Sequence, residues 1–199
     1  MKSVPDPIES TGPWDVSFPE NLGTTSNAKF DELISWSTSP DQGIRHFSGT
    51  ATYQKQFHLP KQLIDPNLSL ELDLGNVAVI AHILMNGEDL GILWKAPFRV
   101  SLDGCAREGV NHLEVRVTNL WPNRLIGDQQ LPGDVEHRGP NVKRWPDWLL
   151  NQTQRSSGRF GFPGYQHYQQ DSDLIVSGLL GPVTVRSYVE AELYDTQND

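Results

Sequence analysis

The sequence predicts an all-β chain that folds as an antiparallel β-sandwich of the jelly-roll type. Several runs alternate strictly between apolar and polar residues, which is the pattern of strands with one buried face. The 17 glycines and 14 prolines indicate many short turns between strands. Helical periodicity is nearly absent, so the strands are expected to build the core.

Four strands are expected in the first 75 residues. Residues 13–18 (PWDVSF) and 30–36 (FDELISW) predict two weaker strands. Apolar and polar side chains alternate over residues 51–59, where Lys55 interrupts the apolar face. Leucines alternate with polar residues over residues 68–75, which predicts a strand with one face in water.

Three further strands follow. Residues 77–87 are apolar on both faces, as expected for a strand in the centre of a sandwich. This run ends in Asn86-Gly87, a strong hairpin signal because both residues tolerate positive φ. Residues 112–120 alternate again, and residues 181–193 supply a closing strand.

The strand pattern lapses over residues 120–175, a stretch that we call the excursion. It is far longer than an ordinary connector, and loops of this length are usually functional. Only residues 144–152 (RWPDWLLNQ) within it predict a short helix. We therefore expect a lead-in over residues 1–11, one sandwich domain over residues 12–190 that carries the excursion, and a polar tail over residues 191–199.

Composition and charge exclude several classes of partner. The net charge of −9 argues against nucleic acid and anionic membranes, because both attract clustered Lys and Arg. No apolar run approaches the ~20 residues that span a bilayer. The N-terminus lacks the apolar core of a secretion signal, so none is expected in this chain. A single cysteine excludes an internal disulfide.

The excursion begins with a dense polar and aromatic group: Trp121, Asn123, Arg124 and Asp128. An aromatic ring packs on the apolar face of a pyranose, while amide, guanidinium and carboxylate groups bind its hydroxyls. The group therefore predicts an edge that binds sugar or docks on a partner. In the alternative, Arg124 and Asp128 pair with each other or with backbone carbonyls to brace the loop, and Trp121 packs down as an anchor.

Five later residues of the excursion join this candidate sugar-binding or docking site. Trp145 and Trp148 lie on one side of a helical turn, where they form a stacking surface or pack the helix onto the sheet. Tyr165, His167 and Tyr168 follow. In an alternating strand, Tyr165 and His167 would share one face and Tyr168 would lie on the other.

The residues indicate no catalytic constellation. A glycosidase needs two carboxylates roughly 5–10 Å apart in a cleft, whereas the acids here follow strand faces and turns. We find no nucleophile-elbow serine, no Gly-rich loop before a helix and no His pair at metal-ligand spacing. Asp128 and the acids of residues 171–173 are conceivable calcium ligands, but their pattern is too weak to predict a metal, so no cofactor is expected.

Seven stretches, in chain order, carry a family resemblance. They are GPWDVSF, FSGTATY, LDLGNV, MNGEDLG, LWKAPF, NHLEVRVTNLWPNRLIGD and SGLLGPV, and TNLWPNRLIGD is the most specific part. With these stretches, which span about residues 12–187, the chain resembles the β-sandwich domain that accompanies the catalytic barrel in glycoside hydrolase family 106, the α-L-rhamnosidases and their relatives. More distantly, it is similar to the sugar-binding jelly roll of family 2 glycosidases. Tyr165 departs from the pattern, since a tryptophan is expected there, and this puts an inherited stacking role in question.

The resemblance implies a galactose-binding-like sandwich that is a non-catalytic accessory domain, because the catalytic acids of such enzymes lie in the barrel. The implied role is to bind carbohydrate or shape substrate for a rhamnosidase-like glycoside hydrolase acting on plant or algal polysaccharide. The implied partners are a carbohydrate and a catalytic barrel domain, in a periplasmic or extracellular parent. Two alternatives stay open: a purely structural domain docked on a barrel, and a small independent glycan-active enzyme.

Overall fold

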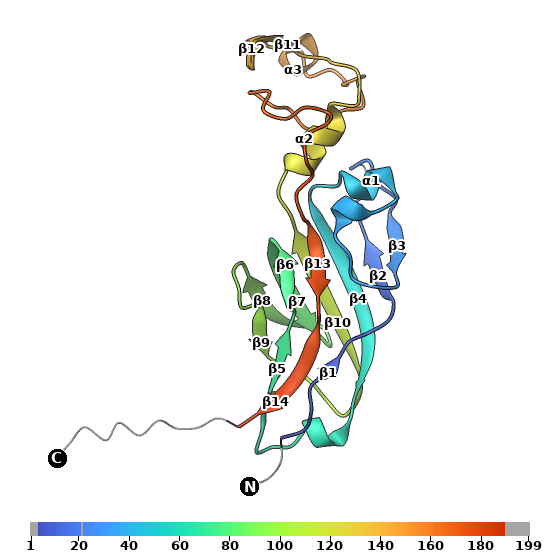
Figure 1. Cartoon of the computed structure of the whole chain (residues 1–199), viewed down its shortest axis with the longest axis vertical. Coiled ribbons are helices and arrows are strands. Elements are labelled where there is room, and N and C mark those ends of the chain that lie inside the picture. Colours follow the sequence, from blue (N-terminus) through green and yellow to red (C-terminus); the bar gives the residue numbers. More distant parts are fainter. Residues whose placement is uncertain (1–3, 21, 190–199) are drawn as a thin grey trace, which may run out of the picture.

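Two antiparallel sheets of unequal size form the sandwich in the computed structural model, which describes residues 4–20 and 22–189 (Figure 1). The larger sheet has six strands in the order β3 (Asn27–Phe30), β2 (Trp14–Ser17), β4 (Thr50–Leu59), β10 (Gly109–Thr118), β7 (Ile80–Met85) and β8 (Glu88–Leu93). The smaller sheet has four strands in the order β1 (Ile8–Glu9), β14 (Thr184–Tyr188), β5 (Ser69–Asp73) and β9 (Arg99–Ser101). Two short pairs complete the strands, namely β6 (Asn76–Ala78) with β13 (Gly178–Gly181), and β11 (Glu136–Arg138) with β12 (Asn141–Arg144). The predicted all-β antiparallel sandwich is confirmed.

Within residues 4–20 and 22–189, helical structure is confined to short segments. These are α1 (Gln42–Arg45), α2 (Pro122–Asp128) and α3 (Asp147–Leu150), with the 3-10 turns η1 (Trp36–Thr38) and η2 (Lys61–Leu63). Within the described ranges, no helix is long and apolar enough to cross a membrane.

The inward faces of both sheets share one core. Tyr53 of β4 and Val115 of β10 are fully buried on the larger sheet, and Leu72 of β5 and Val185 of β14 are buried on the smaller sheet. The outward residues of β4 and β10 alternate with these and remain in contact with water. Apolar and polar residues therefore alternate in the sequence because one face of each sheet is buried and the other is not.

A buried tyrosine hydroxyl links three segments of the core. The indole Nε1 of Trp36 donates to the hydroxyl of Tyr53 at 2.6 Å, and the backbone N–H of Leu179 donates to the same oxygen at 3.2 Å. The Trp36 and Tyr53 rings also stack, with centroids 6.4 Å apart. Burial raises the pKa of Tyr53 far above its ordinary value. The hydroxyl thereby joins η1, β4 and β13.

Most predicted strands are confirmed in place. The runs at residues 13–18, 51–59, 68–75 and 112–120 correspond to β2, β4, β5 and β10. The Asn86-Gly87 turn joins β7 to β8, and both residues have positive φ, 54° and 87°. The closing run begins as β14, while residues 190–193 and the expected tail over residues 191–199 lie outside the described residues.

Two strand predictions are corrected. The prediction for residues 30–36 is wrong, because β3 ends at Phe30 and Trp36 opens the turn η1. The Ser35 side chain accepts the backbone N–H of Ser37, and this local bond favours a turn over a strand. The run at residues 77–87 is divided between β6 and β7, and the outer face of β7 meets solvent rather than a second layer.

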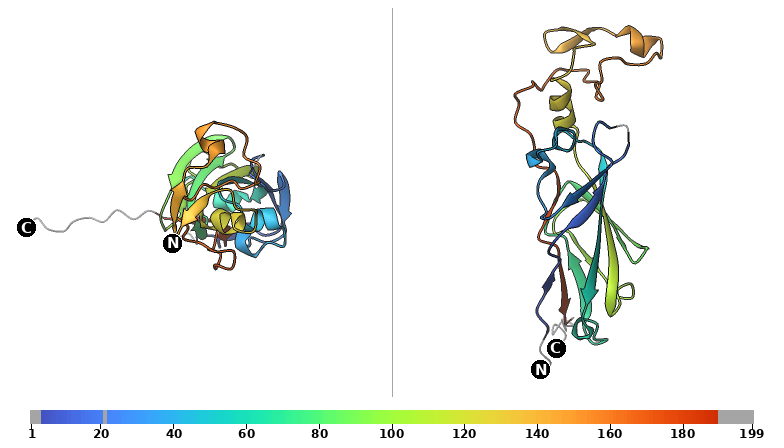
Figure 2. Two further views of the ribbon diagram at one scale, coloured as in Figure 1. Left: turned by 90° about the horizontal axis from the view of Figure 1, so that it is seen from above. Right: turned by 90° about the vertical axis from the view of Figure 1, so that its right-hand side faces the viewer.

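The excursion forms a lobe beyond one end of the sandwich, opposite the end where β1 and β14 lie (Figures 1 and 2). It contains α2, the β11–β12 hairpin and α3. The predicted helix at residues 144–152 is present only as α3, since Arg144 belongs to β12. Neither α2 nor the hairpin was expected from the sequence.

We predict that Tyr53→Phe lowers the free energy of unfolding by about 1–3 kcal/mol, because two buried N–H donors lose their acceptor while the ring volume is kept. Urea denaturation measures this change. Tyr165→Phe, on an exposed ring, is the control and is expected to change the free energy by less than about 0.5 kcal/mol. An unchanged midpoint for Tyr53→Phe would contradict the role given to this hydroxyl.

Candidate functional site

The polar run that opens the excursion is helical rather than a loop. Trp121 precedes α2, and Pro122 occupies its first turn, where a missing N–H costs nothing. Arg124 and Asp128 lie four residues apart and therefore on one side of the helix. This geometry brings together the residues that the sequence singled out.

An ion pair between these two side chains is almost completely buried. The Arg124 Nε lies 3.0 Å from the Asp128 Oδ1, and the two side chains are 8% and 1% exposed. The other carboxylate oxygen of Asp128 accepts the backbone N–H groups of Phe160 and Gly161 at 3.0 and 2.6 Å. Arg124 also lies over the Phe160 ring, 5.1 Å from its centroid. Asp128 thus holds the start of the excursion against residues 160–161.

Asn123 makes a second connection between distant parts of the excursion. Its Nδ2 donates to the carbonyl of Ile175 at 2.8 Å, and its Oδ1 accepts the Ile175 N–H at 2.8 Å. Asn123 is completely buried. Because Ile175 is the last residue of the excursion, this amide joins the beginning of the excursion to its end. We call Asn123, Arg124 and Asp128 the polar cluster of α2.

These contacts favour bracing for the three buried residues. Their side chains are engaged inside the chain, so they are not exposed to a sugar or to another domain. Trp121 differs, because it is 51% exposed and does not pack down as an anchor. Of the first candidate group, only Trp121 presents its side chain to solvent.

A second, partly buried ion pair supports the outer part of the excursion, and no sequence pattern predicted it. Arg155 forms a bidentate pair with Asp134, whose Oδ2 also accepts the Ser157 hydroxyl at 2.6 Å. Burial by itself would raise the pKa of Asp134, but the hydrogen bonds and the Arg155 charge hold it below its ordinary value. The Arg155 guanidinium also lies 4.6 Å from the Trp148 ring.

Trp145 and Trp148 flank the ring of Phe162. The centroid distances are 5.6 Å for Trp145 and 5.8 Å for Trp148. Trp145 is 54% exposed and Leu150 is 63% exposed, so this helical turn does not pack onto the sheet. The packing alternative for the two tryptophans is therefore wrong.

A hollow of about 340 Å³ lies beside α3, and we call it the excursion hollow. The residues that line it include Trp148 and the charged residues Glu136, Arg144 and Asp147. Lys143 lies 3.3 Å from Glu136, and Arg144 lies 3.6 Å from Asp147. An aromatic ring thus stands next to planar carboxylate and guanidinium groups.

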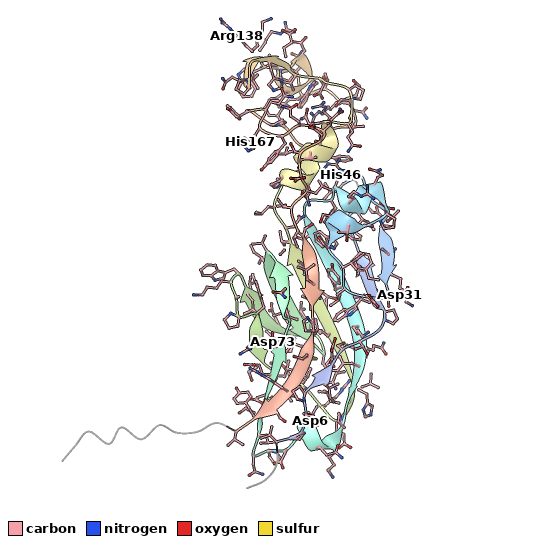
Figure 3. All side chains as sticks on the ribbon, in the orientation of Figure 1. Asp6, Asp31, His46, Asp73, Arg138 and His167 are labelled. Carbon is pink, nitrogen blue, oxygen red and sulfur yellow. The ribbon has the colours of Figure 1, made fainter. Side chains whose placement is uncertain are left out.

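Tyr165, His167 and Tyr168 form a third aromatic group in the excursion, where Figure 3 labels His167. The His167 ring lies 6.5 Å from Tyr165 and 4.7 Å from Tyr168. The predicted alternation of faces is not observed, because this segment is irregular apart from a single bridge between Tyr165 and Asn141. All three rings therefore lie together.

The described residues include no group of three or more His, Cys, Asp or Glu side chains placed to hold a metal ion. Asp128 is occupied by Arg124 and two backbone amides. Asp171 and Asp173 are not grouped with it. No calcium ligand set can be named from this geometry.

Comparison with known proteins relates the chain to parts of larger enzymes. No protein-family model matches it. It is 53% identical over 193 residues, 97% of its length, to a Formosa agariphila protein named "Putative beta-glucuronidase", of which it spans 17%. It is 31% identical to the solved rhamnosidase from Novosphingobium sp. PP1Y, with a TM-score of 0.70 over 94% of this chain and 16% of that one. A β-glucuronidase of an uncultured Clostridium sp. shares only the fold, at 22% identity and a TM-score of 0.50 over 58% of this chain and 22% of that one.

The chain therefore spans about a sixth of the length of the first two relatives, and is similar to a segment of each. Both of those names denote glycoside hydrolases. The resemblance inferred from the sequence agrees with the comparisons at this level.

We predict that Asp128→Asn lowers the free energy of unfolding by about 3–5 kcal/mol, because the buried Arg124 charge loses its counter-ion. Chemical denaturation with two-state analysis measures the loss. The control is Glu136→Gln, which removes a surface ion pair with Lys143 and is expected to cost less than about 1 kcal/mol. Equal stability of the two variants would show that the Asp128 pair does not hold the excursion.

His46 lies where α2 meets α1 (Figure 3). It is 6% exposed, its Nδ1 lies 3.0 Å from the Gln42 carbonyl oxygen, and its Nε2 lies 3.4 Å from the Gln130 amide. A Cβ at Gly127 would lie 2.6 Å from the His46 Cβ, so the α2 backbone packs directly on this residue. Burial lowers the pKa of His46; Arg124 and Arg45 lower it further, against the raising effects of the Gln42 carbonyl and Asp128.

We predict that acidification destabilises the fold through His46. Below pH 6.5 the unfolded chain binds a proton at this residue that the folded chain does not, so the free energy of unfolding falls as pH falls from 6.5 toward the lowered folded pKa. Thermal melts of this protein and of His46→Gln between pH 5 and 8 measure the effect as a difference in the slope of melting temperature against pH. The same slope for both proteins would refute the coupling.

Proposed function

We propose that this chain is a non-catalytic accessory domain of a glycoside hydrolase, and that its excursion binds carbohydrate or shapes the substrate site. The proposed domain covers residues 12–190, with a galactose-binding-like jelly-roll fold. The sandwich provides the support, and the excursion provides the contact surface. This division follows the general pattern in which loops on a rigid scaffold carry function.

The excursion hollow is the observation that carries the proposal. The Trp148 ring gives an apolar surface of the kind that packs on a pyranose, and Arg144 and Asp147 offer planar groups for paired hydroxyls. The exposed ring of Trp145 stands directly beside Arg144 in the chain. Trp121 and the Tyr165, His167 and Tyr168 group extend the proposed surface along the excursion.

The charges around the hollow support binding rather than hydrolysis. Glu136 is paired with Lys143, Asp147 with Arg144, and Asp134 with Arg155. A general acid needs a raised pKa, whereas the pKa of Asp134 is lowered. The catalytic acids are therefore proposed to lie elsewhere in the parent enzyme.

The relatives support a parent that acts on glycans. The rhamnosidase similarity favours a family 106-like parent, and the name of the Formosa agariphila relative favours a glucuronide linkage as the target. We propose plant and algal polysaccharides as the substrate class.

One further observation favours a docking role as the second candidate. Trp145, Leu149 and Leu150 are exposed together in one short segment, and a patch of this kind also suits a contact with another domain. In that role the excursion would bind a catalytic barrel and would contact no sugar.

Calorimetric titration of the chain with rhamnose-, galactose- and glucuronate-containing oligosaccharides tests the first candidate. We expect saturable heat that Trp145→Ala and Arg144→Ala each weaken about tenfold or more, and Trp121→Ala to a smaller extent. Ile34→Ala is the control, since Ile34 is exposed and lies outside the excursion. The absence of binding heat with every ligand, from a sample that melts cooperatively, would reject sugar binding by the excursion.

The docking role then has its own readout. Leu150→Glu in the parent enzyme is expected to separate the melting of this domain from that of the remaining chain. A single unchanged transition would reject docking through this segment.

A further inference from the structure

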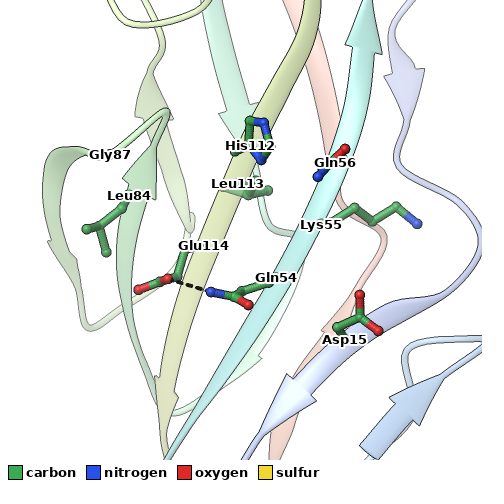
Figure 4. Close-up of a pocket in the computed structure, with 9 residues that line it drawn as sticks. All are labelled: Asp15, Gln54, Lys55, Gln56, Leu84, Gly87, His112, Leu113 and Glu114. Carbon is green, nitrogen blue, oxygen red and sulfur yellow. Dashed lines mark hydrogen bonds between the residues drawn. The ribbon is translucent and has the colours of Figure 1, made fainter.

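The outer face of the six-stranded sheet is open to solvent along its length and carries an ordered array of polar side chains. Leu84, Glu114, Gln54 and Asp15 are paired in register across β7, β10, β4 and β2, and Figure 4 shows them in one row. The next row contains His112 opposite Gln56. Rows on one face lie about 7 Å apart along the strands, and neighbouring strands are about 4.8 Å apart.

A hollow of about 290 Å³ lies over these two rows. The Glu114 carboxylate is held in place there, since Gln54 Nε2 donates to it at 2.9 Å and Arg116 Nε donates to it at 2.8 Å. Across the described part of the chain, the side chains of Gln56 and His112 have no hydrogen-bond partner. Their amide and imidazole groups are therefore free to bind a ligand that enters the hollow.

The opposite corner of the same face is apolar. Ile80 is 37% exposed and Ile92 is 61% exposed, and the register places both on the outer face beside His82 and Thr118. Trp94 directly follows β8 and is 67% exposed, with the Lys95 ammonium 5.5 Å from its ring centroid. Exposed apolar side chains of this size, next to a polar row, are typical of a binding surface.

The charges between the hollow and Trp94 are already paired. His82 lies 2.8 Å from Asp89, and Arg116 lies 2.7 Å from Glu114. The face therefore offers hydrogen bonds and an aromatic surface without a large excess of either charge. This balance disfavours nucleic acid and polyanions, which need clustered cations, and it suits an uncharged ligand rich in hydroxyl groups.

We propose that the outer face of the six-stranded sheet is a second carbohydrate-binding site, which takes a neutral oligosaccharide. One sugar ring stacks on Trp94, and the units in the hollow bind Gln56, His112 and the fixed Glu114 carboxylate. The site lies on the sandwich and not on the excursion, so it goes beyond the proposed function and does not depend on it.

The test is titration of the ¹⁵N-labelled chain with cellotetraose, xylotetraose and a neutral rhamnose-containing tetrasaccharide. We expect saturable shifts in amides of β4, β7 and β10. Trp94→Ala and the double variant Gln56→Ala/His112→Ala each weaken the affinity by about tenfold or more. Trp145→Ala, on the excursion, is expected to leave these chemical shifts unchanged. The substituted side chains are all exposed, so we expect every variant to fold, and thermal melts check this.

The following results would overturn the proposal. They are the absence of saturable shifts with every neutral tetrasaccharide, shifts confined to the excursion, and sheet shifts that survive both the Trp94 and the Gln56/His112 variants. Sheet binding by tetragalacturonate alone would also overturn it, because the ligand would then be acidic. A ligand that occupies both sites gives two binding events, of which Trp94→Ala removes one and Trp145→Ala the other.

Discussion

The buried Arg124–Asp128 ion pair is the interaction on which the arrangement of the excursion depends. Burying two charges is costly unless their remaining hydrogen-bonding groups are satisfied. Here the backbone of residues 160–161 donates to one oxygen of Asp128, whereas Arg124 Nε and the other oxygen have, among the described residues, only their 3.0 Å ion pair. Asn123 adds two bonds to Ile175. The partners lie 32–33 and 52 residues away in the chain, so one helical turn fixes the start, the middle and the end of the excursion. A stretch with little core of its own thereby becomes a defined lobe.

This anchoring separates the residues that support the lobe from those that meet solvent. The polar cluster of α2 and the Asp134–Arg155 pair are inside, while Trp121, Trp145 and Tyr165 present their rings outside. Side chains held by a fixed backbone lose less entropy when they bind a ligand. The outer sheet face obtains the same advantage from strand pairing, since β4, β10 and β7 fix the spacing of its rows. Both proposed carbohydrate surfaces are therefore preorganised, by different means.

The sequence predicted most of the sandwich, because alternation directly records which face of a strand is buried. It correctly predicted β4, β5, β10 and the Asn86-Gly87 turn. It failed at residues 30–36, where serine side chains form local bonds that compete with a strand.

The sequence also failed to predict α2, although Pro122 at the helix start and the four-residue spacing of Arg124 and Asp128 are both signals of a helix. Asp134 and Arg155 are 21 residues apart without any local pattern, so only the fold could pair them. Exposure of Trp145 and burial of Asn123 were likewise decided by tertiary packing.

Hydrogen exchange at three amides tests the central claim, that the excursion is a fixed part of the domain. The N–H groups of Phe160 and Gly161 donate to Asp128, and that of Ile175 donates to Asn123. If the polar cluster of α2 holds the lobe, these amides exchange nearly as slowly as those of β10, although they lie outside any sheet. If they exchange as fast as free peptide amides while β10 stays protected, the excursion opens independently of the sandwich, and the anchoring described here is wrong.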